Sequence, residues 1–218
     1  MAEKQEAAGK TEEEFQKELQ KQKRGPKVLL VMIFSVLIIL AVIIIVARYY
    51  VNKSPQYETY FYNGFSFTKI GPLWYTSLQT GGNLYNVPLH FGPRDLQQIS
   101  MHGTGGLEFL NATEVYITFD PTAENMSYTA LAAAEISQSL VKYFGRTPIA
   151  ACLSKEDKAC IDRPIINCTN TEKPVIFLDA TGDPKVIVSR NCIIIRGSGE
   201  NLVKAADRFL LGYYGIMQ

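Results

Sequence analysis

The sequence has almost no excess of charge of either sign. Its 218 residues include 22 Lys and Arg against 21 Asp and Glu, a formal net charge of +1. Residues 1–27 hold seven of the basic and six of the acidic side chains, which leaves 15 of each over residues 48–218. Nucleic-acid binding requires a basic surface. We therefore expect no nucleic-acid partner for the large C-terminal part of the chain.

Charge is missing altogether from residues 28–47, where Ser35 is the only polar side chain. An α-helix of this length spans about 30 Å, the thickness of the hydrocarbon core of a bilayer. No strand of a soluble core continues this long without a polar residue, so the segment predicts a transmembrane helix. It is also not followed by the small residues of a signal-peptidase site, so we expect a signal anchor that stays on the protein.

Basic residues are unevenly distributed about this segment. Six lie in the 20 residues before it and two in the 20 residues after it. The more basic flank stays in the cytoplasm. We therefore expect a cytoplasmic tail over 1–27, a juxtamembrane linker over 48–56 and an extracytoplasmic domain over 57–218. This organisation predicts a single-pass protein of the cell membrane that contacts the lipid bilayer through residues 28–47.

A second interpretation of the N-terminal region is open. Lys23-Arg24-Gly25 before the apolar segment resembles the leader junction of type IV pilin precursors, in which a peptidase cuts after the glycine. Two residues depart from that pattern, because Pro26 follows the cleavage position and Leu30 stands where these pilins usually carry Glu. A basic flank followed by a helix-starting proline explains the same residues. A pilin-like filament subunit is therefore one alternative function.

The sequence lacks any C-x-x-C pair, which argues against a redox motif of that kind. Its four cysteines, Cys152, Cys160, Cys168 and Cys192, all lie in the distal segment. An even number in an exported domain predicts two disulfides, with three possible connectivities. Apolar runs beside Cys168 and Cys192 favour strands that bring these two together, which leaves Cys152–Cys160 to close a polar loop. The close cysteine pairs of zinc sites are missing, so we expect no metal.

Glycosylation sequons lie beyond the apolar segment. Four N-x-[ST] patterns occur there, and the one at Asn52 is too near the bilayer to be a good acceptor. The candidate glycosylation sites are therefore Asn111, Asn125 and Asn167.

Local patterns over 57–218 predict an α/β or α+β domain with N-terminal β-hairpins, then a mixed sheet with two main helices. Asn63-Gly64 separates two aromatic-rich segments and predicts a two-residue hairpin, and a second hairpin follows over 73–91. Helical periodicity predicts helices over 128–144 and 200–214. Continuous apolar runs are typical of a partly parallel sheet. These runs are 115–119, 149–152, 165–168, 175–178, 186–188 and 192–195.

The glycine-rich segment 101–106 predicts a mobile surface loop and is the first candidate for a binding site. A histidine beside glycines could shuttle a proton while the loop supplies backbone donors to an oxyanion. No serine occupies a G-x-S-x-G setting and the cysteines are assigned to disulfides, so we assign no catalytic residue. The candidate residues of the site are His102, Gly103, Thr104, Gly105 and the second histidine, His90.

Two other segments are interpreted as turns. Gly197-Ser198-Gly199 precedes a helix as in dinucleotide sites, but Leu202 replaces the third glycine and no second βαβ half follows. Asp179 and Asp183 lack the alternating ligands and closing Glu of a calcium loop. We therefore predict no cofactor and no metal.

The C-terminal stretch 191–197, followed by 202–209 and Gly215-Ile216, resembles the ends of single-pass membrane proteins of archaea that have no assigned activity. The resemblance implies a surface location and no particular chemistry. Six aromatic rings between Tyr57 and Phe67 provide a possible contact surface. We therefore expect a binding or assembly module with a protein partner on the outer face, and no enzymatic activity. A membrane-anchored hydrolase-like enzyme that uses the His102 loop is a second alternative.

Overall fold

The computed structural model describes residues 27–50, 57–105 and 112–218. The chain divides into two compact units, Met1–Gln56 and Tyr57–Gln218, and each is described by itself. The predicted cytoplasmic tail up to Pro26, the end of the predicted linker and the sequon at Asn111 lie outside the described residues.

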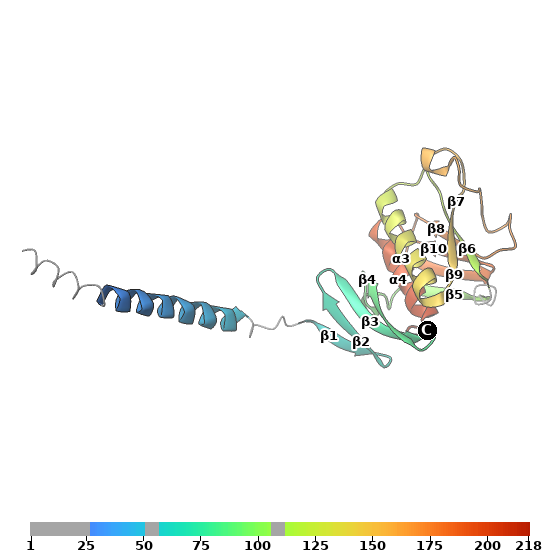
Figure 1. The fold of residues 1–218 in the computed structure, drawn as a ribbon. Helices are drawn as coiled ribbons and strands as arrows, with labels where there is room; N and C mark the ends of the chain where they lie inside the picture. The colour runs from blue at the N-terminus through green and yellow to red at the C-terminus, as the bar shows by residue number, and fades with distance from the viewer. Residues whose placement is uncertain (1–26, 51–56, 106–111) are drawn as a thin grey trace, which may run out of the picture. The chain divides into compact units, whose positions relative to one another are not determined.

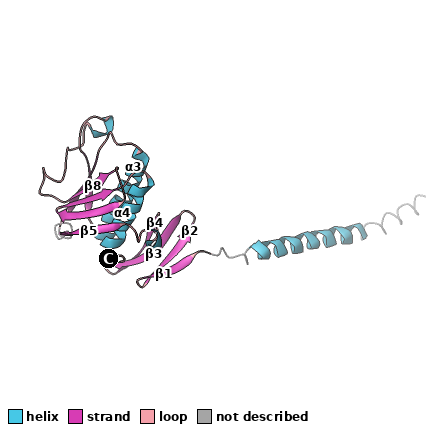
Figure 2. Ribbon diagram, turned by 180° about the vertical axis from the view of Figure 1, so that it is seen from behind, coloured by secondary structure: helices cyan, strands magenta, loops and turns pink. Residues whose placement is uncertain are grey.

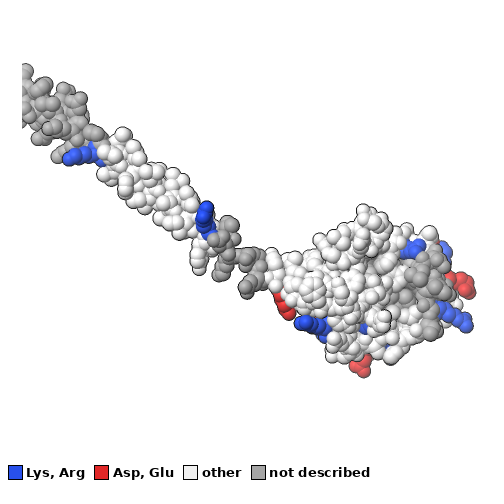
Figure 3. Space-filling model, turned by 90° about the horizontal axis from the view of Figure 1, so that it is seen from below, with Lys and Arg blue, Asp and Glu red and all other residues white. Residues whose placement is uncertain are grey.

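The described part of the first unit is a single helix, Lys27–Tyr50. Its most apolar 18-residue window has a mean hydropathy of 3.6, and none of that window is buried within the protein. In Figure 3 the helix carries charged side chains only near its two ends. At a rise of about 1.5 Å per residue, its length is sufficient to cross a bilayer. The helix is therefore a candidate membrane span, and it includes residues 48–50, which the sequence had assigned to the linker.

The second unit begins with an antiparallel sheet of four strands, in the order β1-β2-β3-β4. Its strands are β1 (Thr59–Tyr62), β2 (Phe65–Ile70), β3 (Leu73–Thr80) and β4 (Asn83–Leu89). The hairpin turn between β1 and β2 is the predicted one, since Asn63 and Gly64 both have positive φ, 47° and 83°. A two-residue type I′ turn requires this backbone conformation, which Asn and Gly adopt most easily.

A second sheet of six strands follows, in the order β5-β9-β10-β8-β6-β7. Strands β10, β8, β6 and β7 run parallel, and β9 is antiparallel to β10. The predicted mixed, partly parallel sheet is therefore confirmed. The strands are β5 (Ser100–Gly105), β6 (Glu114–Phe119), β7 (Thr147–Cys152), β8 (Val175–Asp179), β9 (Lys185–Arg190) and β10 (Cys192–Arg196).

Two helices, α3 (Met126–Phe144) and α4 (Glu200–Tyr213), lie side by side and pack against the six-stranded sheet. Alternate strand residues face them, among them Ile117, Ile176 and Ile193, which are all at most 3% exposed. Figure 2 shows the four-stranded sheet beside the same pair of helices, from the opposite direction to Figure 1. Both sheets contribute to one hydrophobic core, which includes Phe67 from β2. The second unit is therefore a single α/β domain.

Two sequence-based predictions of local structure are wrong. Residues 100–105 form strand β5, where a mobile loop was expected, and His102 is paired with Ile187 of β9. Gly103 has φ +117°, and a Cβ there would lie 1.8 Å from the carbonyl oxygen of Val188. The glycine is thus required by the close approach of β9. The apolar run 165–168 is also no strand, since only Ile165 forms an isolated bridge, with the end of β7.

Candidate functional site

Two disulfides hold the long segment 153–174 that joins β7 to β8. Cys152 at the end of β7 is bonded to Cys160, and Cys168 is bonded to Cys192, the first residue of β10. The preferred connectivity is therefore confirmed, although Cys168 lies outside any strand. Both ends of the segment are tied to the six-stranded sheet by covalent bonds.

The structure does not combine the sequence-predicted site residues into one site. His102 is exposed on β5 and makes no side-chain hydrogen bond or ion pair within the described residues. Thr104 and Gly105 continue the same strand. His90 follows β4 instead, and its Nδ1 contacts the Oε1 of Glu135 on α3. His90 thus belongs to a different polar group, one that the sequence did not reveal.

This polar group contains two carboxyls, the partly buried Glu135 on α3 and the fully buried Asp207 on α4. Asp207 is wholly buried, and its Oδ2 accepts a hydrogen bond of 2.7 Å from the Phe91 N–H. Burial raises the pKa of Asp207 well above its usual range, and the nearby Glu135 carboxyl raises it further. Burial also raises the pKa of Glu135, against the effect of its contact with His90. Ionising both carboxyls together is therefore unfavourable.

The remaining oxygens of the pair, Glu135 Oε2 and Asp207 Oδ1, are buried and have no hydrogen-bond partner in the described part of the chain. His90 and Phe91 come directly after β4, so the group lies where the four-stranded sheet meets α3 and α4. A buried carboxyl with an unpaired oxygen avoids its charge by keeping a proton. We infer that the group makes this contact between the layers sensitive to pH.

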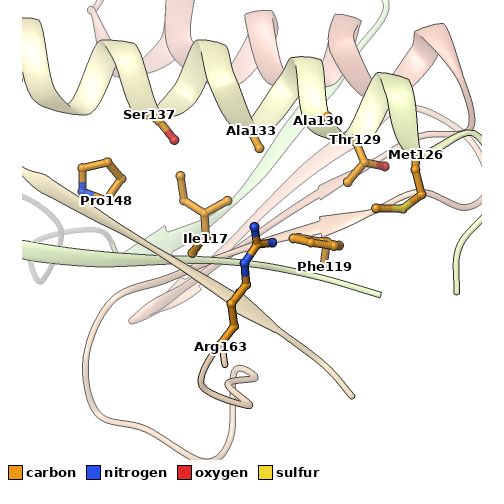
Figure 4. A pocket seen from close by; sticks show the side chains of 10 residues that line it. Ile117, Phe119, Met126, Thr129, Ala130, Ala133, Ser137, Pro148 and Arg163 are labelled. Carbon is orange, nitrogen blue, oxygen red and sulfur yellow. The ribbon is translucent and has the colours of Figure 1, made fainter. Parts of the chain in front are cut away.

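A cavity of about 270 Å³ lies between α3 and the edge of the sheet formed by β6 and β7. Figure 4 shows the side chains of one face of α3 opposite those of the two strands. Seven of its ten lining residues are apolar. The lining residues are Ile117, Phe119, Met126, Thr129, Ala130, Ala133, Ser137, Pro148, Ala150 and Arg163.

Small side chains on both walls explain the hollow. Ala130 and Ala133 face it from α3, and Pro148 and Ala150 face it from β7. Ile117 of β6 pairs with Ala150 in the parallel register, so one large and one small side chain meet α3 there. β7 is the edge strand of the sheet, the position where a proline without an N–H is tolerated.

The cavity contains one cation, Arg163, from the segment between the Cys152–Cys160 disulfide and the Ile165 bridge. Its guanidinium points into the cavity beside Phe119, 5.8 Å from the ring centroid. It makes no ion pair or side-chain hydrogen bond among the described residues. Thr129 is 1% exposed, and its hydroxyl oxygen has no hydrogen-bond partner there either. The cavity thus combines apolar walls with a cation that contacts the Phe119 ring but no described anion, and with a hydroxyl that has no hydrogen-bond partner among the described residues.

A more polar crevice of about 340 Å³ lies at the carboxyl ends of β6 and β8. Ligands of open α/β sheets often bind in such a position. Its carboxylates already have protein partners, however, since Asp179 accepts from Arg196 at 2.6 Å and Asp120 accepts from Thr122 at 2.7 Å. Among the described residues, no cluster of His, Cys, Asp or Glu could hold a metal ion. The cavity beside α3 is therefore the stronger candidate binding site.

Comparison with protein families, with curated proteins and with solved structures finds no match to this chain. The interpretation of the cavity therefore depends on its geometry and chemistry.

Proposed function

We propose that the protein is a single-pass, membrane-anchored binding module. Its N-terminal tail lies in the cytoplasm, the helix Lys27–Tyr50 crosses the membrane, and the domain over 57–218 binds a small ligand outside. The cavity beside α3 is the binding site. The single observation that carries the proposal is this cavity, which has apolar walls and a guanidinium that points into it and makes no ion pair or side-chain hydrogen bond with the described residues.

Two further observations support the location. Six basic residues precede the apolar segment and two follow it within the same distance, which favours a cytoplasmic N-terminus. The two disulfides of the domain fit an oxidising compartment.

Asn125, exposed directly before α3, is an accessible glycosylation candidate, whereas Asn167 already accepts hydrogen bonds through its Oδ1.

Lysine labelling in intact cells tests the orientation. A membrane-impermeant amine reagent should modify lysines of the domain, such as exposed Lys155 and Lys158. Lysines of the tail should react only after the membrane is permeabilised. The reverse pattern would contradict the proposed orientation. The intact mass of the extracted protein separately tests the pilin-like alternative, which requires loss of residues 1–25.

An uncharged probe tests whether the cavity binds ligands at all. Benzene at ten times its Kd should stabilise the domain by about 1.4 kcal/mol, or raise its Tm by roughly 3 to 5 °C. Ala133→Leu places a leucine in the cavity and should abolish this shift. Ala134→Leu is the matched control, because Ala134 is the next residue of α3 and is exposed. Equal shifts in both variants, or no shift in the wild type, would refute the binding site.

A further inference from the structure

We propose that the ligand of this cavity is a small carboxylate with an apolar chain of about six to eight carbons. The inference rests on the proposed binding function and adds the chemical class of the ligand. The charge of Arg163, the polarity of the walls and the volume of the cavity each restrict that class.

The charge of the ligand follows from Arg163. A guanidinium is ionised at all physiological pH values, and the half-buried side chain of Arg163 gives up part of its hydration in the apolar cavity. In the described part of the chain no carboxylate pairs with Arg163, so an anionic group of the ligand can supply the missing partner. A carboxylate matches the planar fork of a guanidinium with two parallel hydrogen bonds. Among the described residues a single cation lines the cavity, which favours a ligand with a single negative charge.

The rest of the cavity favours an apolar chain. Apart from Arg163, the polar lining residues are Thr129 and Ser137, whose hydroxyls lie on α3 across from the guanidinium. At about 30 Å³ for each water-sized group, 270 Å³ holds roughly nine non-hydrogen atoms. Hexanoate and octanoate bracket this size, whereas most of the acyl chain of a membrane lipid would extend beyond the cavity.

The fold also positions the cation before any ligand arrives. Arg163 lies three residues after Cys160, whose disulfide joins this segment to the end of β7. Its backbone N–H donates a hydrogen bond of 3.3 Å to the Cys160 carbonyl oxygen. Because the segment is tied to the strand that lines the cavity, ligand binding should cost little conformational entropy of the backbone around Arg163.

Calorimetric titration of the full chain in lipid nanodiscs tests the proposal, with empty nanodiscs as the blank. The probes are octanoate, 1-octanol and octylamine, which share a chain and differ in charge. We expect octanoate to bind at least tenfold more tightly than octanol, and the protonated amine not to bind at the site. Arg163→Gln should weaken octanoate binding about 10- to 100-fold and leave octanol binding unchanged. Lys158→Gln, which removes an exposed cation from the same segment, is the matched control.

The outcomes separate the ligand class from the binding site. If octanol binds as tightly as octanoate to the wild type, the carboxylate is refuted, whether or not Arg163→Gln folds. Loss of octanol binding in Ala133→Leu would show in that case that the cavity itself still binds ligands. If none of the probes binds and benzene gives no thermal shift, the proposed function fails as well. An unchanged octanoate affinity in Arg163→Gln would also overturn the proposal.

Discussion

Replacing Asp207 by Asn tests whether the pair of carboxyls formed by Glu135 and Asp207 lowers stability as the pH rises. The Asp207 side chain is wholly buried, and burial together with Glu135 raises its pKa. A raised pKa means that the folded chain holds this proton more tightly than the unfolded chain does. The stabilisation is therefore fully present below the unfolded pKa of about 4 and is lost as the pH rises through the folded pKa.

The size of the effect follows from proton linkage. Wherever the folded chain carries one proton more than the unfolded chain, the free energy of unfolding falls by about 1.4 kcal/mol per pH unit. Asp207→Asn keeps a carbonyl oxygen for the Phe91 N–H and removes the charge beside Glu135. We expect this variant to lose most of the slope and to be more stable than the wild type at pH 7. Any slope that remains would include the contribution of Glu135, whose pKa burial also raises.

Urea unfolding of the full chain at a series of pH values from 5 to 8 measures this slope. Trp74 is the only tryptophan and is 6% exposed, so its fluorescence reports the unfolding of the domain. Asp162→Asn, which removes an exposed carboxylate, is the matched control and should keep the wild-type slope. A wild-type stability that is constant or rises over this range would refute the reasoning. Equal slopes in the wild type and Asp207→Asn would do the same.

Three further predictions concern the stability of the domain. Phe67→Ala should lower the free energy of urea unfolding by about 3 to 5 kcal/mol, because Phe67 is fully buried in the common core. Replacing Cys168 and Cys192 together by Ser should cost about 3.5 kcal/mol in the same assay, from the loop entropy of a 24-residue separation. Gly103→Ala should speed hydrogen exchange of the β5 amides, because the new Cβ meets the β9 backbone. Gly71→Ala, which also has positive φ but nothing within 4 Å of its Cβ, should leave β5 protected.

Much of the fold could be predicted because it is encoded by local patterns. Asn63-Gly64 specifies its hairpin through the φ values that the turn demands, and apolar periodicity identifies both helices. Continuous apolar runs predicted the parallel strands, since a strand covered on both faces needs few polar residues. The preferred disulfide connectivity was correct for a related reason: Cys192 begins β10, and the segment that contains Cys168 is close to it.

The elements that escaped prediction depend on contacts between distant residues. β5 contains two glycines, which oppose strand formation locally, yet its pairing with β9 requires Gly103. The cavity exists because alanines of α3 face small residues of β7, and neither segment is unusual by itself. In the sequence, Glu135 has the pattern of a solvated residue on an amphipathic helix. Only the folded structure brings it near Asp207, which lies on the other helix. The sequence could therefore identify the layers but not the site between them.

The position of β5 has a consequence for the order of events during synthesis. β5 stands at the edge of the sheet beside β9, and about 85 residues separate the paired His102 and Ile187. At a translation rate of about 5 to 20 residues per second, β9 is synthesised roughly 4 to 17 s after β5, and β5 remains unpaired during that time. Cys152 and Cys160 are both available for oxidation before β9 emerges, whereas Cys168 must wait for Cys192, which follows β9. The Cys152–Cys160 disulfide is thus expected to form first. The Cys168–Cys192 disulfide can form only after β9 and the first residue of β10 have been synthesised.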